Sequence, residues 1–413
     1  MTSTNGVFVT EMLPWTTGHG TVLIDIADVR DVAALRQLYF AVYGPSYPLR
    51  LGTDPAVMTA ALEAPGVRWL VARHAESGDV VGSAVLRGDV TARIGKVEGL
   101  AVHPGHAGAG IARALLSELC EEAFGPHGAM DSVYATARCV SPVPQRALMR
   151  QGFRPMGLLP GAVELHQRET LALVIRHREG VLARRAPIPE VPERILPLLE
   201  AAARATGHLD FTGVRPRPAP PQVCPRPEAE PIEVIQATGF VQRRYAQKAR
   251  GSVPSLPLSP PNVLLTPQDG RFEAYGVIDK EGGCGTLLDV VPSTASPGGI
   301  APPDGTASPG EGLGDVVHAM AKHGAAYVET LLPLADHERL ERYLAHGFVP
   351  SALYPAMRHD DGVWHDYVLL AHASGRPDFR ALDTDAAFAP YVEQYSRSWT
   401  ATYLNTFTTE PPR

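Results

Sequence analysis

A glycine-rich turn in the first half of the chain has the residue types of an anion-binding site. The stretch VEGLAVHPGHAGAGIARALL, residues 97–116, combines an apolar strand, a His-Pro pair, a glycine-rich turn and the start of a helix. The first N–H groups of a helix lack intrahelical partners and its dipole is positive there, so such a turn favours phosphate. Gly108 and Gly110 carry no Cβ, which lets the backbone approach an anion closely. The spacing therefore predicts a phosphate-binding turn.

Two common phosphate loops do not fit this turn. A P-loop ends in Gly-Lys-Ser/Thr, and the turn contains no lysine. A dinucleotide-binding fold needs a third glycine where Arg113 stands, and it places its turn after the first strand of the domain. Here the turn follows about 100 residues of chain.

The segment LAVHPGHAGAGIARALL instead resembles the acyl-CoA-binding motif of the GNAT acetyltransferase superfamily. In that motif Leu-x-Val-x-Pro is followed by Arg/Gln-x-x-Gly-x-Gly/Ala and an apolar helix. The matching positions are Leu100, Val102, Pro104, Gly108, Gly110, Ala112 and Leu115. The Arg/Gln position is Ala107 here, so Arg113, His106 or backbone N–H groups would have to replace one side-chain contact near the pyrophosphate.

The resemblance spans roughly residues 22–176 and implies an acyl-CoA, in the first place acetyl-CoA, as co-substrate without a metal. The residues that it assigns to binding this cofactor are Leu100, Ala101, Val102, Ala107, Gly108, Ala109, Gly110, Ile111, Ala112 and Arg113.

The resemblance also implies a mechanism. In that family the pantetheine arm pairs with the strand as another strand would, which here assigns the pairing to the backbone of Leu100 and Val102. An N–H near Leu100 would polarise the thioester carbonyl, as a fixed donor for charge that develops only in the tetrahedral state. A base must remove a proton from the amine before the amine can attack. Glu98 lies two residues before Leu100, so we expect both side chains on one face and Glu98 as the base. The alternative is that Glu98 is a carboxylate hydrogen-bonded for structure.

The departing thiolate needs a proton, and the sequence offers no obvious donor. Many relatives have a tyrosine four residues before a Gly-Phe pair, but Leu148 occupies that position here. The nearest donors in the sequence are Tyr134, Cys139 and Ser141. Our catalytic candidates are therefore Glu98, Tyr134 and Ser141.

The elements around the turn predict a mixed α/β fold. The order β-α-α-β-β-β-α-β-α-β-β matches that of the family, and helices alternate with strands only in its second half, which favours a mixed sheet. The expected elements are a strand and a helix in 21–44, a helix in 54–64, two strands in 67–89, a strand in 96–103, a helix in 110–125, a strand in 132–139, a helix in 142–152, and strands in 153–163 and 169–178.

An internal repeat predicts a second copy of this fold. Residues 133–163 and 326–358 both give a strand, a polar turn, a short helix and then Gly-Phe-x-Pro. Tyr343 stands where relatives have their acid, but no Gly-x-Gly/Ala turn precedes a helix in this copy. We therefore expect a degenerate second copy in which Tyr343 is a packing residue. We expect it to shape the acceptor pocket or an interface.

The predicted domain organisation follows from the repeat and from changes in composition. An N-terminal acyltransferase domain is expected at 1–185 and the degenerate copy at 186–378, followed by a helical tail at 379–413. Within the second domain we expect a Pro-rich insertion at 214–231 and a low-complexity loop at 292–312.

Composition excludes several classes of protein. A chain of 413 residues is long enough for two domains, and a net charge of -7 argues against binding nucleic acid. Four scattered cysteines indicate neither a disulfide scaffold nor a zinc site, and no signal or membrane segment is expected, which favours the cytoplasm. Residues 357–368 contain two histidines and three acidic residues; they could bind a metal, but we interpret them as a hairpin turn.

The sequence thus predicts an acyl-CoA-dependent N-acyltransferase that acetylates an amine of a small molecule. The acidic balance slightly favours a cationic or small polar acceptor. We expect no nucleic-acid or membrane partner, and either a monomer with a pseudo-dimeric tandem or a homodimer. Two alternatives stay open: a non-catalytic tandem module that senses CoA or binds a partner, and an acyltransferase that uses another donor such as a carrier-protein thioester.

Overall fold

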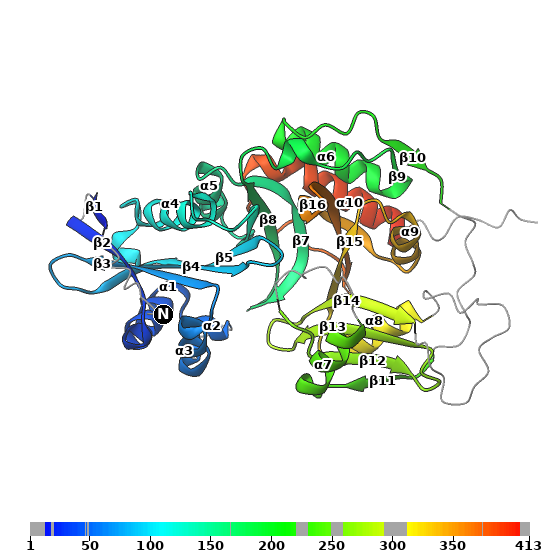
Figure 1. Cartoon of the computed structure of the whole chain (residues 1–413), viewed down its shortest axis with the longest axis horizontal. Coiled ribbons are helices and arrows are strands. Elements are labelled where there is room, and N and C mark those ends of the chain that lie inside the picture. The colour runs from blue at the N-terminus through cyan, green and yellow to red at the C-terminus, as the bar shows by residue number, and fades with distance from the viewer. Residues whose placement is uncertain are drawn as a thin grey trace, which may run out of the picture. The chain divides into compact units, whose positions relative to one another are not determined.

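The computed structural model describes residues 13–17, 20–45, 47, 49–165, 167–219, 230–248, 259–292, 312–373 and 375–404. By its internal contacts the chain divides into two compact units (Figure 1). The first comprises residues 1–135 and 150–152, and the second comprises residues 136–149 and 153–413. Among the described residues, no helix has the length and apolar character needed to cross a membrane.

The first unit is a mixed sheet between helices, as the sequence predicted. Strands β1 to β5 pair antiparallel in chain order, and the start of β6 pairs parallel with β5. The short strand β1 and the one-turn helix α2 were not expected. The elements are β1 Leu13–Thr17, β2 Gly20–Ile26, α1 Val32–Tyr43, α2 Arg50–Thr53, α3 Pro55–Glu63, β3 Val67–His74, β4 Val80–Asp89, β5 Ile94–Val102, α4 Ile111–Phe124 and β6 Ser132–Arg138.

Helices cover both faces of this sheet (Figure 1). On one face, α1 and α3 bury a cluster that includes Leu35, Tyr39, Met58, Trp69 and Val85. On the other face α4 packs so closely on β4 that a Cβ on Gly82 would lie 2.6 Å from Ile111 Cγ2. Sequence pattern explains both faces, because apolar side chains recur at helical spacing in α1 and α4.

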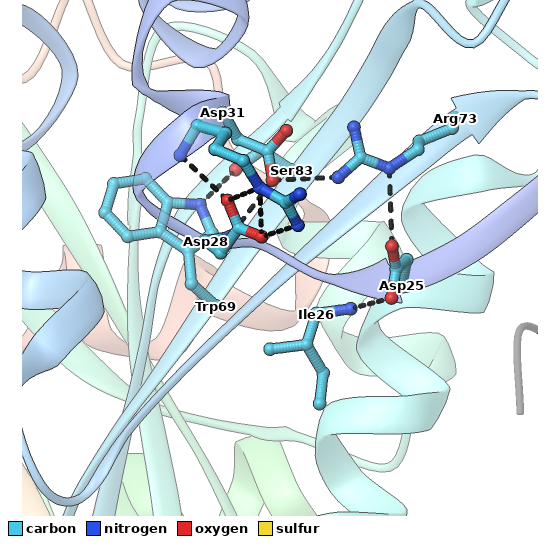
Figure 2. A network of polar contacts seen from close by, with 8 residues as sticks. Asp25, Ile26, Asp28, Asp31, Trp69, Arg73 and Ser83 are labelled. Carbon is cyan, nitrogen blue, oxygen red and sulfur yellow. Dashed lines mark hydrogen bonds and ion pairs between the residues drawn. The ribbon is translucent and has the colours of Figure 1, made fainter. Parts of the chain in front are cut away.

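A polar network fixes the start of α1 against the sheet (Figure 2). From β3, Arg73 Nη2 donates to Asp31 at 2.8 Å, and its Nε lies 3.5 Å from Asp25 on β2. Beneath it, Trp69 Nε1 donates to the buried Ser83 Oγ at 2.8 Å. These contacts connect β2, β3 and β4 with the start of the helix whose far end reaches β5.

The second unit contains the remaining elements. Its strands run in the order β8-β7-β16-β17-β15-β14-β13-β12-β11, with β14 and β15 parallel. Its elements are α5 Pro142–Arg150, β7 Arg154–Glu164, β8 Arg168–His177, β9 Glu190–Pro192, α6 Leu196–Thr206, β10 Arg215–Arg217, β11 Ile232–Ile235, α7 Thr238–Lys248, β12 Val263–Pro267, β13 Phe272–Asp279, β14 Cys284–Pro292, α8 Leu313–Lys322, β15 Tyr327–Pro333, α9 His337–Ala345, β16 Val349–Asp360, β17 Val363–Ala373 and α10 Ala389–Tyr403.

Several predicted segments fall in this unit. Strand β10 lies in the predicted Pro-rich insertion, of which residues 220–229 are outside the described residues. Residues 293–311 of the expected low-complexity loop are also outside the described residues. The tail is helical as α10, while 405–413 are outside the described residues. The prediction of a hairpin for 357–368 is confirmed, because Asp360 pairs with Val363 across the turn.

The hairpins β7–β8 and β16–β17 share their irregularities. On β7, residues 160–162 stand opposite one residue of β8, and on β16 residues 355–357 stand opposite one residue of β17. The middle residue has positive φ in each bulge, +71° at Gly161 and +47° at Ala356. Both hairpins have a second register shift, after Pro155 and after Pro350.

The two hairpins pair with each other at equivalent residues. Strands β7 and β16 run antiparallel, with Gly157 opposite Ala352. A Cβ on Gly157 would lie 2.4 Å from Ala352 Cα, so only glycine permits this approach. Because Gly157 and Ala352 occupy the same place in the two hairpins, this pairing is locally two-fold symmetric.

Candidate active site

Strand β5 is paired on both sides only along its first half. Residues Ile94 to Val97 pair with Ser132 to Ala135 of β6, whereas β5 continues to Val102. From Glu98 onward the described pairings give β5 no partner on this side. Exposed strand edges can bind an extended chain through their N–H and C=O groups. The second half of β5 is therefore an edge that an extended ligand can pair with.

A β-bulge shapes this edge. Gly99 and Leu100 together stand opposite the single residue Ala84, and Gly99 has φ +62°. Tyr39 Oη donates to the Gly99 carbonyl and Tyr43 Oη to the Leu100 carbonyl, both at 2.8 Å. Two tyrosines of α1 thus fix the backbone at the positions assigned to the thioester.

The bulge also overturns one prediction. The expectation that Glu98 and Leu100 share a face assumed strict alternation along β5, and the extra residue at Gly99 breaks that alternation. The two-residue spacing therefore does not place the carboxylate beside Leu100.

Glu98 lies in a cluster with two cations. Its carboxylate is 2.6 Å from Lys96 Nζ and 3.1 Å from Arg87 Nε, and its side chain is 19% exposed. Burial by itself would raise the pKa of Glu98, but the charges and hydrogen bonds of Lys96 and Arg87 outweigh it and hold that pKa below its ordinary value. The group is ionised at neutral pH and is a weak base.

The glycine-rich turn has the geometry of an anion site. Gly108 and Gly110 adopt φ of +78° and +81°, and Gly110 is the N-cap of α4 without a side-chain capping bond. The first turn of α4 contains no acidic residue. A Cβ on Gly108 would meet nothing within 4 Å, so this side of the backbone is open. The N–H groups at the start of α4 can therefore bind a negative charge.

The other residues assigned to the cofactor are not all accessible at this turn, because Ala101 on β5 and Ile111 at the start of α4 are buried. Ala107 and Arg113 are exposed, and the Gly110 Cβ position lies 3.3 Å from Trp15 Nε1. The ring of His106 lies 5.8 Å from that of His74 and 6.0 Å from that of His103, between centroids. Imidazoles and an indole N–H thus adjoin the turn where the family's Arg/Gln is missing.

The structure places two of the catalytic candidates, Glu98 and Tyr134, on the same face of the sheet in the first unit. Tyr134 on β6 pairs in register with Lys96 on β5, so both side chains point to the face that also carries Glu98. Ser141 belongs to the second unit, where its Oγ accepts from Val143 N at 3.3 Å before α5.

Cys139 is a poor proton donor. It is buried in the second unit, where burial, with a smaller effect of Glu169, raises the pKa of the thiol to about 12. Tyr343 is fully buried, and burial raises the pKa of its hydroxyl, as suits the packing role that we expected for it.

Sequence reasoning missed the aromatic wall beside the bulge. The rings of Tyr43 and Tyr47 stack with centroids 4.2 Å apart, and the ring of Tyr39 lies 6.2 Å from each. The signal was present in the four-residue spacing of these three tyrosines, which the sequence analysis did not use. Among the described residues, no group of three or more His, Cys, Asp or Glu side chains could hold a metal ion.

Comparison with known proteins identifies the first part of the chain. Residues 32–153 match the model of the acetyltransferase (GNAT) family. A search of curated proteins finds no match.

A search of solved structures matches several acetyltransferases over part of this chain. Ribosomal-protein-S5-alanine acetyltransferase from Vibrio fischeri is 12% identical over 41% of this chain and 98% of its own, with a TM-score of 0.35. Phosphinothricin acetyltransferase from Sinorhizobium meliloti, solved with AcCoA, is 23% identical over 38% and 90%, with a TM-score of 0.33. Mutant forms of spermidine/spermine N-acetyltransferase from Vibrio cholerae are 15% identical over 40% and 97%, with a TM-score of 0.34. The family model and the mixed fold together identify residues 32–153 as a GNAT acetyltransferase domain.

Proposed function

We propose that this protein transfers an acyl group, in the first place acetyl, from acyl-CoA to an amine of a small molecule. One observation carries the proposal: the half-paired edge of β5 leads directly into the uncapped start of α4 through the turn at residues 103–110. Acyl-CoA has a diphosphate for the turn and an extended pantetheine arm for the edge. Both binding elements lie in the first unit.

The bulge at Gly99 supports an oxyanion role for the neighbouring backbone. Tyr39 and Tyr43 bind the two bulge carbonyls, so the peptide groups around Leu100 are held before substrate arrives. A fixed N–H donor stabilises charge that appears on the thioester oxygen only in the tetrahedral state. The amine nitrogen attacks the carbonyl carbon, the C–S bond breaks, and CoA leaves as a thiolate.

Two protons move in this reaction. The amine loses one, and Glu98 is our candidate to accept it directly or through water. Its lowered pKa makes it a weak base, so the amine must arrive largely neutral. The thiolate gains the other, for which Tyr134 is a better candidate than Ser141 because it belongs to the same unit as the turn.

Local charge restricts the acceptor. The cluster of Arg87, Lys96 and Glu98 has two cations and one carboxylate, so its net charge is positive although the chain is acidic. This arrangement favours a neutral amine or one bearing an anionic group over the cationic acceptor that composition suggested.

We also propose that the second half is a degenerate copy of the same fold, so that the chain is a tandem of two. The matching bulges at Gly161 and Ala356 and the pairing of Gly157 with Ala352 support this proposal. The internal pairing makes a monomer the simplest assembly. A cytoplasmic location is part of the same proposal, on the grounds of composition.

Two measurements on the full chain test the transferase function. Titration calorimetry should show saturable binding of acetyl-CoA, and a thiol-release assay with a panel of primary amines should show turnover. Glu98→Gln should lower kcat, whereas Asp131→Asn, which changes another buried arginine-paired carboxylate of this unit, should leave it near wild type. Binding without turnover of any amine would favour the CoA-sensing alternative. Absence of binding to both acetyl-CoA and CoA would overturn the proposal.

A further inference from the structure

A cavity of about 220 Å³ lies wholly within the second unit, and none of the residues that line it is assigned to acyl transfer. Strands β16 and β17 provide its polar side chains, and residues 186–188 with the end of β15 provide an apolar wall. Its volume is below the roughly 300–1,000 Å³ of pockets for drug-sized ligands, so it suits a small metabolite.

Asp366, which lines this cavity, stands opposite the bulge of β16. The Ala356 backbone, at φ +47°, donates its N–H to Asp366 Oδ1 at 2.8 Å. The other oxygen of Asp366 accepts from Arg185 Nη1 at 2.7 Å, and the Asp366 side chain is 0% exposed. A left-handed conformation is unfavourable at a non-glycine residue and persists where the surroundings enforce it. A buried, charge-neutral pair thus holds the strained backbone in place.

Two further charges of opposite sign line the cavity. Arg358 and Asp360 are two residues apart on β16, so their side chains lie on the same face. His365 stands directly opposite Arg358 on β17 and adds a second nitrogen donor group. Pro187, Ile188 and Pro333 form the apolar wall. A ligand that contacts all of these groups must carry an anion, a cation and an apolar body.

The equivalent place in the other hairpin does not have these charges. By register, Val163 corresponds to Arg358 and Thr170 to Asp366. His365 corresponds to Glu169, a carboxylate that pairs with Arg138. The polar set is therefore particular to β16–β17 and does not follow from the repeated fold.

We propose that this cavity binds a free α-amino acid with a small apolar side chain. The carboxylate contacts Arg358 and His365, the ammonium contacts Asp360, and the side chain packs against Ile188 and the two prolines. The cavity is a second small-molecule site, distinct from the acyltransferase site in residues and in ligand.

Titration calorimetry of the full chain with leucine, valine and isoleucine tests the proposal. We expect saturable binding of at least one of them. The matched acid without the amine, 4-methylpentanoate, and the matched amine without the acid, 3-methylbutylamine, should each bind at least tenfold more weakly. Equal affinity for leucine and either analogue would overturn the zwitterion assignment, and absence of heat with all three amino acids would overturn the site.

Variants locate the binding. Arg358→Gln and Asp360→Asn should each weaken binding at least tenfold. Asp361→Asn is the control, because Asp361 is exposed in the hairpin turn, outside the cavity lining, and its φ of +48° suits asparagine. Ile188→Trp fills the cavity from its apolar side and should abolish binding even where the charge variants fail to fold.

One more comparison separates this site from the acyltransferase site. Gly108→Ala changes the phosphate turn alone and should leave amino-acid affinity unchanged. Full affinity in Ile188→Trp, or loss of amino-acid binding in Gly108→Ala, would place the bound amino acid elsewhere and refute the proposal.

Discussion

Replacing Gly108 with alanine tests whether the turn binds a diphosphate. Gly108 has φ +78°, and its Cβ position meets no atom within 4 Å, so the substitution adds no clash inside the protein. Only the left-handed conformation is penalised, by roughly 1–2 kcal/mol. The new methyl group occupies the open side of the turn, where a phosphate must approach. Losing one charge-assisted hydrogen bond costs about 1.5–3 kcal/mol, which predicts an acetyl-CoA affinity about 10 to 150 times weaker.

Gly78→Ala is the matched control. Gly78 has φ +76° and also an open Cβ position, but it lies in the turn between β3 and β4. Both variants should lose the same stability in urea unfolding, and calorimetry should show weaker acetyl-CoA binding for Gly108→Ala alone. Equal affinity in the two variants, or equal weakening, would refute the assignment of the diphosphate to this turn.

Three further predictions concern the residues that hold the two sites. Tyr39→Phe removes a hydroxyl that binds a bulge carbonyl, and it should lower kcat more than it changes the KM for acetyl-CoA in steady-state thiol release. The folded-state pKa of Glu98 is lowered, so the ionised Glu98 stabilises the fold fully above about pH 4.5 and loses this effect as the pH falls through the folded pKa. Lys96→Met removes one partner of that carboxylate and should therefore lower the free energy of unfolding more at pH 7 than at pH 3.5, as measured by urea unfolding. Arg185→Met leaves Asp366 buried without a counter-charge and should cost about 3–5 kcal/mol in the free energy of unfolding, a loss that Asp366→Asn in the same chain should partly restore.

The strand, turn and helix that form the phosphate site could be predicted because their signals are local. Helix α4 spans Ile111–Phe124, within the expected 110–125, since its apolar residues recur at helical spacing and glycine stands at either end. The left-handed conformations of Gly108 and Gly110 follow from the residue type. Asp54 caps α3 by accepting from Ala56 N at 2.9 Å, and an Asp-Pro pair at the start of a helix is itself a local signal of such a cap.

The surroundings of Glu98 depend on contacts that sequence spacing does not reveal. Arg87 reaches the carboxylate from β4, and that approach is set by the register of two strands. A glycine inside a strand pattern is a known signal of a bulge, and Gly99 is one. Strict alternation along β5 ignored this signal, so the predicted face of the carboxylate was wrong while the strand itself was confirmed.

Domain limits depend on which strands pair across the chain. The sequence repeat placed a boundary at residue 185, whereas the contacts divide the chain after Ala135. The reason is that β7 pairs with β16 at residues about 195 positions apart and β8 pairs with β7, so both strands belong to the second unit. A repeat in the sequence shows where each copy begins and ends along the chain, but only the strand pairing shows that β7 and β8 belong to the second unit.

Helix α10 adds a physical argument for the tandem. Tyr391 Oη donates to the carbonyl of Pro155 at 2.8 Å, and Gln394 Nε2 donates to the carbonyl of Pro350 at 3.1 Å. These prolines precede the same register shift in the two hairpins, each two residues before the pair formed by Gly157 and Ala352. One helix can bond to both carbonyls because antiparallel pairing at equivalent residues presents them symmetrically. A chance likeness between two helix–strand units would not require matching bulges, a shared pairing point and equivalent carbonyls on one helix, so these three features together favour a duplicated fold.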